Sequence, residues 1–548
     1  MTDAGSLVPD LLHPAPACRL DRERTRVALE LAFAGGPASA LFEEALSTAS
    51  LAPSRWEPGC FAGDLFLTRF VAGCLKLRIG TAELAPSVPQ LCRLLGNPPA
   101  ERSVVEFRRA VLGELASTPA LRSALEQLYL HLARLKTLLE NPEGIQDFDP
   151  QRRQLDVLAA LKEVIERAAT GFGGSGTGLA RLTEYGRRVR ESEPYRSLSD
   201  LLRYDENMAT LDLRVGIGAD GRIRGLSITA VEEDRQNVFS LPAWRRWLAK
   251  VELFARGYRM SDGELMARLI DAVFSGVAHE LIALIQLHRD LEFYLGALGF
   301  RDAARAAGLE MCLPELVEAS EPRELIGLYN PLLLMSGIQP VPCDLRTRTM
   351  TTTVLVTGPN SGGKTRLLQS VGLAQLLAQS GLFIPARAGK VALASALLVS
   401  LIQVASAEQA EGRLGMELIR IRDLFERLSP GAMVLLDELC SGTNPSEGEE
   451  IFELVVEKLS RLEPQAFITT HFLAFAARLE QEQKYDSLAF LQVELEQGSP
   501  TYQFAPGVAS TSLAGQAAER LGVTGEQLEA LVERSLARDR GASSGHRS

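Results

Sequence analysis

TTTVLVTGPNSGGKTRLL, from Thr351 to Leu368, is the stretch that decides the fold of this chain. Its apolar start predicts a buried β-strand over Thr352–Val356, followed by a glycine-rich turn and the start of a helix. The turn has the spacing of a phosphate-binding loop, in which glycines let backbone N–H groups approach phosphate oxygens. The loop consists of Gly358, Pro359, Asn360, Ser361, Gly362, Gly363, Lys364 and Thr365.

The last two residues of this loop have side chains suited to a Mg²⁺-bound nucleotide. Lys364 would reach the β- and γ-phosphates, and the Thr365 hydroxyl would coordinate Mg²⁺. The following helix favours an anion at its N-terminus through its dipole. A glycine turn that matches by accident is the alternative, so the assignment depends on residues further along the chain.

Two later apolar stretches end in residues with the required chemistry. Met433–Leu436 predicts a buried strand that ends at Asp437 and Glu438, and Phe467–Thr470 predicts another that ends at His471. Ligands of α/β sheets bind at the carboxyl ends of the strands. We therefore expect an ATP site in which Asp437 holds Mg²⁺, either directly or through a water, Glu438 polarises the attacking water and His471 senses the γ-phosphate.

Length and composition indicate an ordinary globular protein with several domains. The chain has 548 residues, of which 46% are hydrophobic and 23% are charged, and this length exceeds what one core supports. The net charge of −11 argues against wholesale polyanion binding, although local basic patches could still serve that purpose. Seven scattered cysteines without a Cys-x-x-Cys pair predict reduced thiols and a cytoplasmic location. We expect no signal peptide and no membrane partner.

Four regions are predicted along the chain. Residues 1–100 form a helical region of unknown role, and residues 101–340 form a helical core and lever, comparable to a clamp. Residues 341–535 form an α/β P-loop ATPase domain. Residues 536–548 form a polar tail that is predicted to be disordered.

The helical core region is predicted to contain one β element and one long helix. Alternating apolar residues near 210–229 predict a β-hairpin. Apolar residues at helical spacing predict a helix after Ser261, whose capping-box spacing marks the start. A helix of about 35 residues would be about 50 Å long, and since it leads to the nucleotide site, it could carry a conformational signal.

Three local patterns leave more than one interpretation. The run GFGGSGTG at residues 171–178 lacks a Lys-Thr ending and a preceding strand, which favours a flexible link over a second phosphate loop. Phe42, in Phe-Glu-Glu, is better explained as a core residue than as a wedge beside a mismatched base. Four basic side chains are either a phosphate-backbone contact or a solvated helix face: Arg181, Arg187, Arg188 and Arg190.

The order and spacing of the site motifs resemble those of the MutS-type ATPases of the ABC class. The resemblance rests on GPNSGGKT, LLDELCSGTNPSEG and ITTHF, and it is strong over about residues 341–520. It extends back to about Leu201 through the hairpin, the long helix and Asn330-Pro331, where the family usually has His-Pro. The GTNPSEG stretch is closer to MutS paralogues that lack mismatch-reading domains than to the mismatch-repair protein itself.

This resemblance implies a dimer with two composite ATP sites, each completed by a signature segment of the partner. It also implies that helical arms clamp DNA, and that ATP controls the opening and closing of the clamp on mismatched, branched or otherwise structured DNA in repair or recombination. The corresponding segment here, AEGRLGME at residues 410–417, lacks the family's serine. An adenine-stacking aromatic is not evident, and Ile338 or Val341 is expected to provide an apolar substitute.

The residues and the resemblance support three functional hypotheses. The first is a MutS-type DNA-binding ATPase that recognises DNA structure more than sequence. The second is a MutS-like ATPase that acts as a mechanical switch on a non-DNA partner, such as the ribosome or a protein complex. The third is a structural dimer with a vestigial site, and the full set of site residues argues against it.

Overall fold

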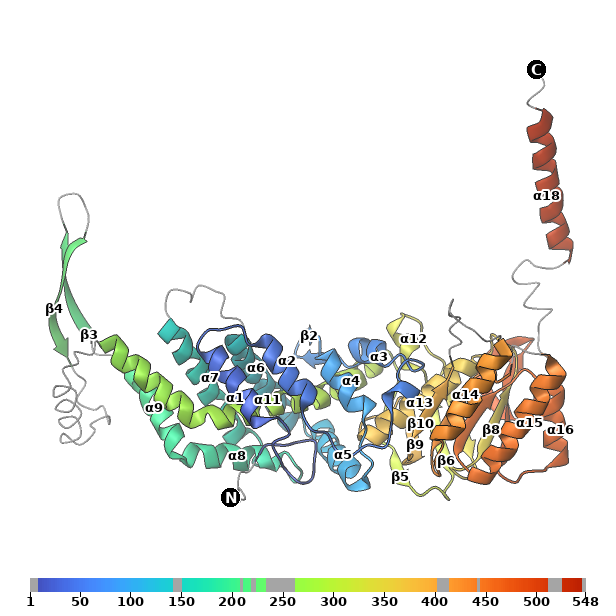
Figure 1. Cartoon of the computed structure of the whole chain (residues 1–548), viewed down its shortest axis with the longest axis horizontal. Helices are drawn as coiled ribbons and strands as arrows, with labels where there is room; N and C mark the ends of the chain where they lie inside the picture. The colour runs from blue at the N-terminus through green and yellow to red at the C-terminus, as the bar shows by residue number, and fades with distance from the viewer. Residues whose placement is uncertain are drawn as a thin grey trace. The chain divides into compact units, whose positions relative to one another are not determined.

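The computed structural model of this chain describes residues 8–140, 150–206, 210–217, 223–232, 262–401, 413–440, 444–510 and 525–544. The chain forms two compact units (Figure 1). The first unit comprises Met1–Leu51, Ile79–Ala82 and Phe107–Leu295. The second comprises Ala52–Arg78, Glu83–Glu106 and Gly296–Ser548.

The first unit is mainly helical, with one β-hairpin at the position that the alternating sequence predicts. The hairpin pairs β3 (Thr210–Ile217) with β4 (Ile223–Glu232) in antiparallel register. Helices α5 (Arg102–Ser117) and α11 (Asp262–Ala306) contribute residues to both units. The other helices of the first unit are α1 (Arg22–Phe33), α2 (Ser39–Thr48), α6 (Pro119–Glu140), α7 (Pro150–Gly171), α8 (Ala180–Glu191) and α9 (Glu193–Glu206).

Helix α11 is the long helix that the sequence predicts, and it is 45 residues long. Among the described helices, it alone is long and apolar enough to cross a membrane, and 56% of its most apolar window is buried. Within the first unit, its Phe274 ring stacks on Phe33 with the centroids 3.8 Å apart. A core helix that is covered on most sides has this composition.

Phe42 on α2 is 3% exposed, which agrees with its interpretation as a core residue.

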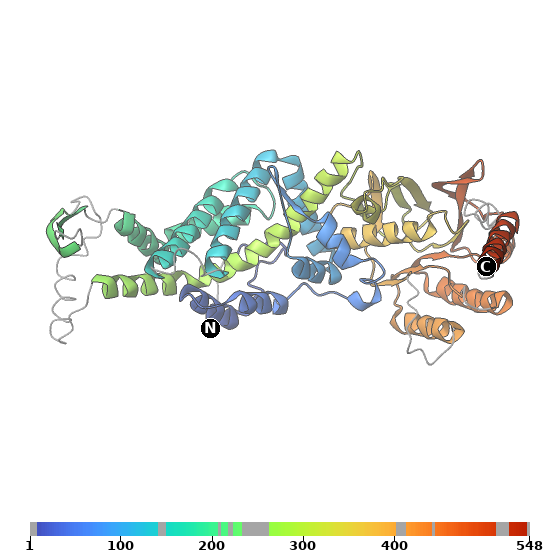
Figure 2. The ribbon, with the colours of Figure 1, turned by 90° about the horizontal axis from the view of Figure 1, so that it is seen from above.

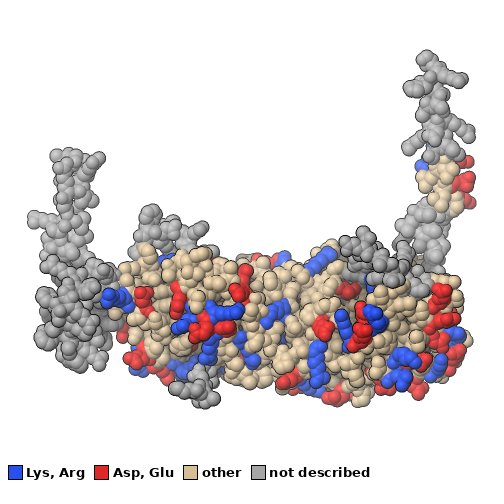
Figure 3. Space-filling model, in the orientation of Figure 1, with Lys and Arg blue, Asp and Glu red and all other residues tan. Residues whose placement is uncertain are grey.

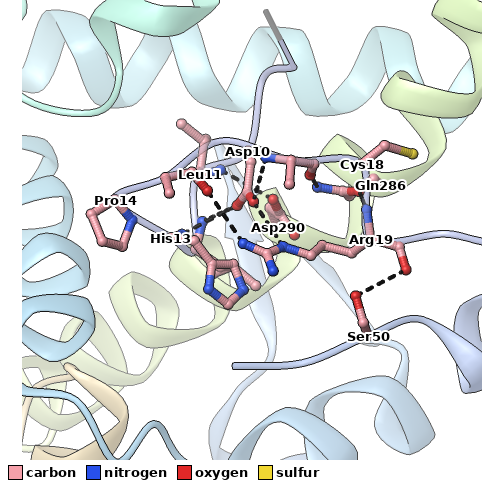
Figure 4. Close-up of polar contacts among 12 residues, drawn as sticks. Asp10, Leu11, His13, Pro14, Cys18, Arg19, Ser50, Gln286 and Asp290 are labelled. Atoms are coloured by element: carbon pink, nitrogen blue, oxygen red, sulfur yellow. Dashed lines mark hydrogen bonds and ion pairs between the residues drawn. The ribbon is translucent and has the colours of Figure 1, made fainter. Parts of the chain in front are cut away.

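A buried polar cluster fastens the segment before α1 to α11 (Figure 4). The Asp10 carboxylate accepts hydrogen bonds from the backbone N–H groups of Leu12 at 3.0 Å and His13 at 3.2 Å. Asp290 on α11 accepts one from the Leu11 N–H at 3.2 Å. Arg181 on α8 donates to the carbonyl oxygens of Asp10 and His13 at 3.0 and 2.6 Å. Arg181 therefore holds this segment, and the phosphate-contact interpretation is wrong for it.

The glycine-rich run between α7 and α8 is an ordered turn, so the prediction of a flexible link is wrong. The Glu114 carboxylate on α5 accepts hydrogen bonds from the Ser175 hydroxyl at 2.6 Å and the Gly176 N–H at 2.8 Å. The Thr177 hydroxyl donates a third at 2.5 Å. A distant carboxylate thus orders a segment whose composition alone indicates mobility.

Asp290 gives the first unit a testable dependence on pH. Burial raises the pKa of its carboxyl to about 7, with Arg289 lowering this pKa and Asp10 raising it. Between pH 6 and 8 the unfolded chain has already lost this proton, while the folded chain loses it as the pH passes 7. The folded state therefore binds more protons below pH 7, and its stability falls as the pH rises through 7.

We expect Asp290→Asn to remove this component of the pH dependence. Relative to the variant, the wild-type protein should lose about 1 kcal/mol of unfolding free energy between pH 6 and pH 8. Thermal unfolding followed by circular dichroism measures the difference, with Asp271→Asn at an exposed position of α11 as the matched control. The assignment is wrong if Asp290→Asn and Asp271→Asn show the same pH dependence.

The second unit contains the two apolar strands predicted beside the glycine-rich loop. They belong to a six-stranded sheet in the order β10-β11-β12-β8-β13-β14. The first five strands in this order run parallel to their neighbours, and β14 runs antiparallel to β13. The bounds are β8 (Thr353–Thr357), β10 (Leu397–Ser400), β11 (Met433–Leu436), β12 (Gln465–Thr469), β13 (Leu488–Glu496) and β14 (Ser499–Pro506).

The two faces of β11 carry different helices because successive side chains of a strand point to opposite faces. Val434 and Leu436 join a buried cluster with Phe452 of α15 (Pro445–Leu462). Leu435 faces α13 (Lys364–Ser380), where a Cβ on Gly372 would lie 2.8 Å from Leu435 Cδ1. In Figure 2 the yellow α13 and the orange α14 (Arg413–Arg427) and α15 lie on opposite sides of the sheet.

The first hundred residues do not form a separate region, in contrast to the predicted boundary. Residues 52–78 and 83–106 pack in the second unit. Trp56 is 4% exposed and its Nε1 donates to the Ala394 carbonyl oxygen at 3.0 Å. A Cβ on Gly372 of α13 would also lie 2.9 Å from Leu65 Cδ2, so Leu65 packs closely against α13. Apolar periodicity shows which face of an element is buried, but it does not show which core covers that face.

The second unit contains further elements besides the main sheet. A four-stranded sheet has the order β5-β9-β6-β7. Helix α18 (Gly525–Ser544) occupies residues up to Ser544, so the structure differs from the predicted disordered tail that starts at residue 536. The other bounds are η1 (Pro58–Cys60), α3 (Leu67–Cys74), β1 (Leu77–Ile79), β2 (Ala82–Leu84), α4 (Val88–Gly96), β5 (Glu315–Val317), β6 (Arg323–Leu328), α12 (Pro331–Met335), β7 (Cys343–Thr347), β9 (Ala388–Ala392) and α16 (Leu473–Glu482), with β1 and β2 at the boundary with the first unit.

Candidate functional site

The glycine-rich loop connects the end of β8 to the start of α13. Gly358 has a φ of 136° and Gly363 a φ of 86°, both in the region that favours glycine. A Cβ on Gly358 would lie 2.7 Å from Val493 Cγ2 on β13. Glycine at position 358 is therefore required both by the backbone conformation and by the close approach of β13.

Lys364 is held inside this loop. Its Nζ donates to the carbonyl oxygens of Gly358 at 2.9 Å and Pro359 at 3.1 Å, and the residue is 3% exposed. Burial lowers the pKa of Lys364, whereas the nearby Glu438 and Asp437 carboxylates raise it. The ammonium group thus lies in the loop close to both predicted acidic residues, where it can exchange carbonyl oxygens for phosphate oxygens.

Thr365 and Asp437 meet although they are far apart in the sequence. The Thr365 hydroxyl donates to Asp437 Oδ2 at 2.5 Å, which joins the start of α13 to the end of β11. A hydroxyl and a carboxylate oxygen are ligands that Mg²⁺ prefers. Because the two oxygens are this close, one cation could contact both, so the residues fit the predicted metal.

Glu438 has an unusual backbone conformation. Its φ is 48°, in the left-handed region, and Cys440 follows with a φ of 61°. Residues other than glycine adopt this conformation at a cost, and such residues are concentrated at functional sites. The Glu438 N–H donates to the Thr469 hydroxyl at 2.8 Å, which ties this turn to the end of β12.

His471 lies beyond the end of β12, on an exposed turn. The Thr470 N–H donates to the Val356 carbonyl oxygen of β8 at 3.1 Å, so this turn begins beside the strand that enters the loop. The centroid of the His471 imidazole lies 4.2 Å from the centroid of the Phe472 ring. The described contacts bring Lys364, Thr365, Asp437 and Glu438 together, while His471 is connected to them through the backbone of Thr469 and Thr470.

Tyr502 on β14 is a site residue that the sequence reasoning missed. It is 46% exposed and has a φ of 61°. Its ring lies over the loop, because a Cβ on Gly363 would be 3.2 Å from Tyr502 Cδ1. The sequence shows only an aromatic residue at this position, whereas its exposure and the pairing of its strand with β13 are seen in the structure.

The two apolar residues expected beside the base are both exposed. Ile338 is 54% and Val341 is 46% exposed. The Gln503 side chain donates to the Pro342 carbonyl oxygen at 2.9 Å, so the segment that carries Val341 lies beside β14. Of the three residues, the structure therefore places only the Tyr502 ring against the loop, and an aromatic face of this kind can stack on a flat heterocyclic base.

Asp437 and Glu438 also line a cavity of about 190 Å³ on the side of the sheet that carries α14. Ser400, Arg420 and Cys440 are among its other lining residues. Residues 410–412 of the predicted signature segment lie outside the described part of the chain, as do residues 441–443 of the LLDELCSGTNPSEG motif.

Comparison with known proteins supports the motifs of the second unit. Residues 354–533 match the family model described as MutS domain V. The chain is 34% identical over 233 residues to the Endonuclease MutS2 of Streptococcus mutans, covering 41% of this chain and 29% of that protein. It is 31% identical over 273 residues to the Endonuclease MutS2 of Thermomicrobium roseum, covering 47% of this chain and 33% of that protein. The chain thus spans about a third or less of the length of these relatives.

Proposed function

We propose that this chain, which belongs to the MutS family by its domain V, is an ATP-dependent DNA-binding protein. ATP hydrolysis would drive the opening and closing of a clamp on mismatched, branched or otherwise structured DNA in repair or recombination. The observation that carries the ATPase part is the 2.5 Å contact between Thr365 and Asp437. This contact brings the start of α13, which follows the glycine-rich loop, next to the end of β11, which is followed by Asp437 and Glu438.

Each residue of the site has a defined part in this proposal. Lys364 and the N–H groups of the loop would bind the phosphates and offset their negative charge. Thr365 and Asp437 would hold Mg²⁺, which supplies charge stabilisation at the phosphates when bound. Glu438 would orient and polarise the attacking water, and His471 would contact the γ-phosphate. The Tyr502 ring would stack on the base.

A homodimer with composite sites is part of the same proposal. The segment at residues 410–417, which would complete the partner's site, contains no serine. We therefore expect hydrolysis in the dimer to be slow or differently regulated from that of family members with the serine.

The charge distribution favours a second candidate function alongside DNA binding. On the face shown in Figure 3, basic and acidic side chains are interspersed among the described residues. Arg190 of the predicted basic helix face pairs with Glu166 at 3.4 Å. With a net charge of −11, the chain could instead act as a mechanical switch on a non-DNA partner, such as the ribosome or a protein complex.

Fluorescence anisotropy with labelled DNA separates the two candidates. We expect the purified chain to bind at least one of homoduplex, mismatched, branched and single-stranded DNA, with an affinity that falls as salt rises from 50 to 200 mM. The reason is that phosphate contacts release counterions, so about six such contacts would reduce the affinity by about 10³-fold over this range. Absence of salt-dependent binding to all four DNAs would exclude the first candidate and favour the second.

A further inference from the structure

Thr469, the last residue of β12, makes two hydrogen bonds that none of the roles above uses. Its hydroxyl donates to Asp437 Oδ1 at 2.5 Å and accepts from the Glu438 N–H at 2.8 Å. The residue is fully buried, with 0% of its surface exposed. A single hydroxyl therefore contacts both acidic residues of the candidate site, as a donor to Asp437 and as an acceptor from Glu438.

These bonds fix the orientation of the Asp437 carboxylate. Oδ1 accepts from Thr469 on β12, and Oδ2 accepts from Thr365 at the start of α13. With a donor on each oxygen, the plane of the carboxylate cannot rotate freely. Without Thr469, only the Thr365 side would be held, and Thr365 is itself a predicted ligand of Mg²⁺.

The same hydroxyl supports the strained turn at Glu438. The φ of 48° places this residue in a conformation that needs a compensating contact. The contact here is the bond from the Glu438 N–H to Thr469, and its loss would leave this backbone donor without that partner. A small rotation of this turn would move the Glu438 carboxylate, and hydrolysis is sensitive to such displacements.

We propose that Thr469 is a positioning residue of the ATPase site, which sets the geometry of Asp437 and Glu438 through one hydroxyl. Thr469 precedes His471 by two residues, so the hydroxyl also links the strand end that carries the predicted γ-phosphate sensor to the two acidic residues. A movement of this strand end on loss of the γ-phosphate would then be transmitted to the metal ligand and to the water-polarising residue. This inference rests on the proposed ATP hydrolysis.

A purely structural role of a buried threonine is the alternative, and the neighbouring strand supplies the control. Thr353 on β8 is also 0% exposed, and its hydroxyl has no hydrogen-bond partner among the described residues. The two threonines lie in adjacent parallel strands of one sheet. Thr353→Val therefore makes the same chemical change in the same core without removing a contact to the acidic residues.

The test compares Thr469→Val, Thr469→Ser and Thr353→Val in the full chain. We expect Thr469→Val to lower kcat for ATP by about 10- to 100-fold, as for the loss of a hydrogen bond to a charged group. Its Kd for a fluorescent ATP analogue should change by less than about threefold at saturating Mg²⁺, while half-saturation with Mg²⁺ should shift to higher concentration. Thr469→Ser should restore kcat, and Thr353→Val should leave it unchanged.

Several results would overturn the proposal. One is a wild-type kcat in Thr469→Val, and another is an equal loss in the Ser and Val variants. A third is a loss of kcat in Thr353→Val as large as that in Thr469→Val, since it would indicate a general effect on the core. If the wild-type chain hydrolyses no ATP, the proposed function fails instead, and the Mg²⁺ dependence of ATP-analogue binding still decides the role of Thr469.

Discussion

Lys364→Ala is expected to abolish nucleotide binding, with the affinity for ATP falling by at least about 100-fold. The Lys364 ammonium is the one side-chain cation within the glycine-rich loop, and it is buried there at 3% exposure. A hydrogen bond to a charged group contributes about 1.5–3 kcal/mol, and each 1.4 kcal/mol corresponds to a tenfold change in affinity. Because the ammonium would bond to both the β- and the γ-phosphate, its removal would cost two such bonds, about 3–6 kcal/mol, which corresponds to at least about 100-fold in affinity.

Equilibrium titration with a fluorescent ATP analogue measures this effect. Lys390→Ala is the matched control, because Lys390 lies half-buried on β9 in the smaller sheet. Thermal unfolding of both variants checks that the fold is kept. Wild-type affinity in Lys364→Ala would mean that the nucleotide binds elsewhere, or that the loop N–H groups suffice without a cation.

Glu438→Ala is expected to lower the rate of ATP hydrolysis by about 10²- to 10⁴-fold, the usual contribution of a general base. Its left-handed backbone and its hydrogen bond to Thr469 define the turn at the end of β11. Burial lowers the pKa of the nearby Lys364, and the Glu438 carboxylate acts in the opposite direction, which shows that the two groups are close. The loop and the metal ligands remain intact in this variant. ATP should therefore bind and stay bound, and the ATP-bound dimer should accumulate.

Single-turnover hydrolysis and size-exclusion chromatography with ATP measure the two consequences. Glu450→Ala removes an exposed carboxylate on α15 and is the matched control. If Glu438→Ala hydrolysed ATP at the wild-type rate, another residue would polarise the water. If Glu438→Ala hydrolysed ATP at the reduced rate but formed no more dimer than the wild-type chain, only the proposed effect on dimer assembly would be contradicted.

The sequence predicted three strands of the α/β part well, because β8, β11 and β12 are fully buried and a residue of the candidate site closely follows each of them. Met433–Leu436 is an apolar run that matches β11 in full, and Asp437 follows it directly. The sequence also places Thr365 at the start of α13, as observed. The proximity of Thr365 and Asp437 follows from parallel strands, whose carboxyl ends lie at one edge of the sheet.

Other features depend on contacts between distant segments, which local patterns do not contain. Glycine content alone indicated a mobile link at residues 171–178, but the Glu114 carboxylate orders that turn from another helix. Arg181 has the charge of a phosphate contact, yet its guanidinium holds the backbone carbonyls of the first segment. Tyr502 was missed because only the pairing of β13 with β14 brings it to Gly363.

The central claim is that the site built from Lys364, Thr365, Asp437 and Glu438 hydrolyses Mg²⁺-bound ATP. The most direct test is the rate of phosphate release from ATP by the purified full chain, with and without Mg²⁺, beside Glu438→Ala under the same conditions. We predict release that requires Mg²⁺ and that is lost in Glu438→Ala. Equal release by the two proteins, or release that is indifferent to Mg²⁺, would contradict the claim.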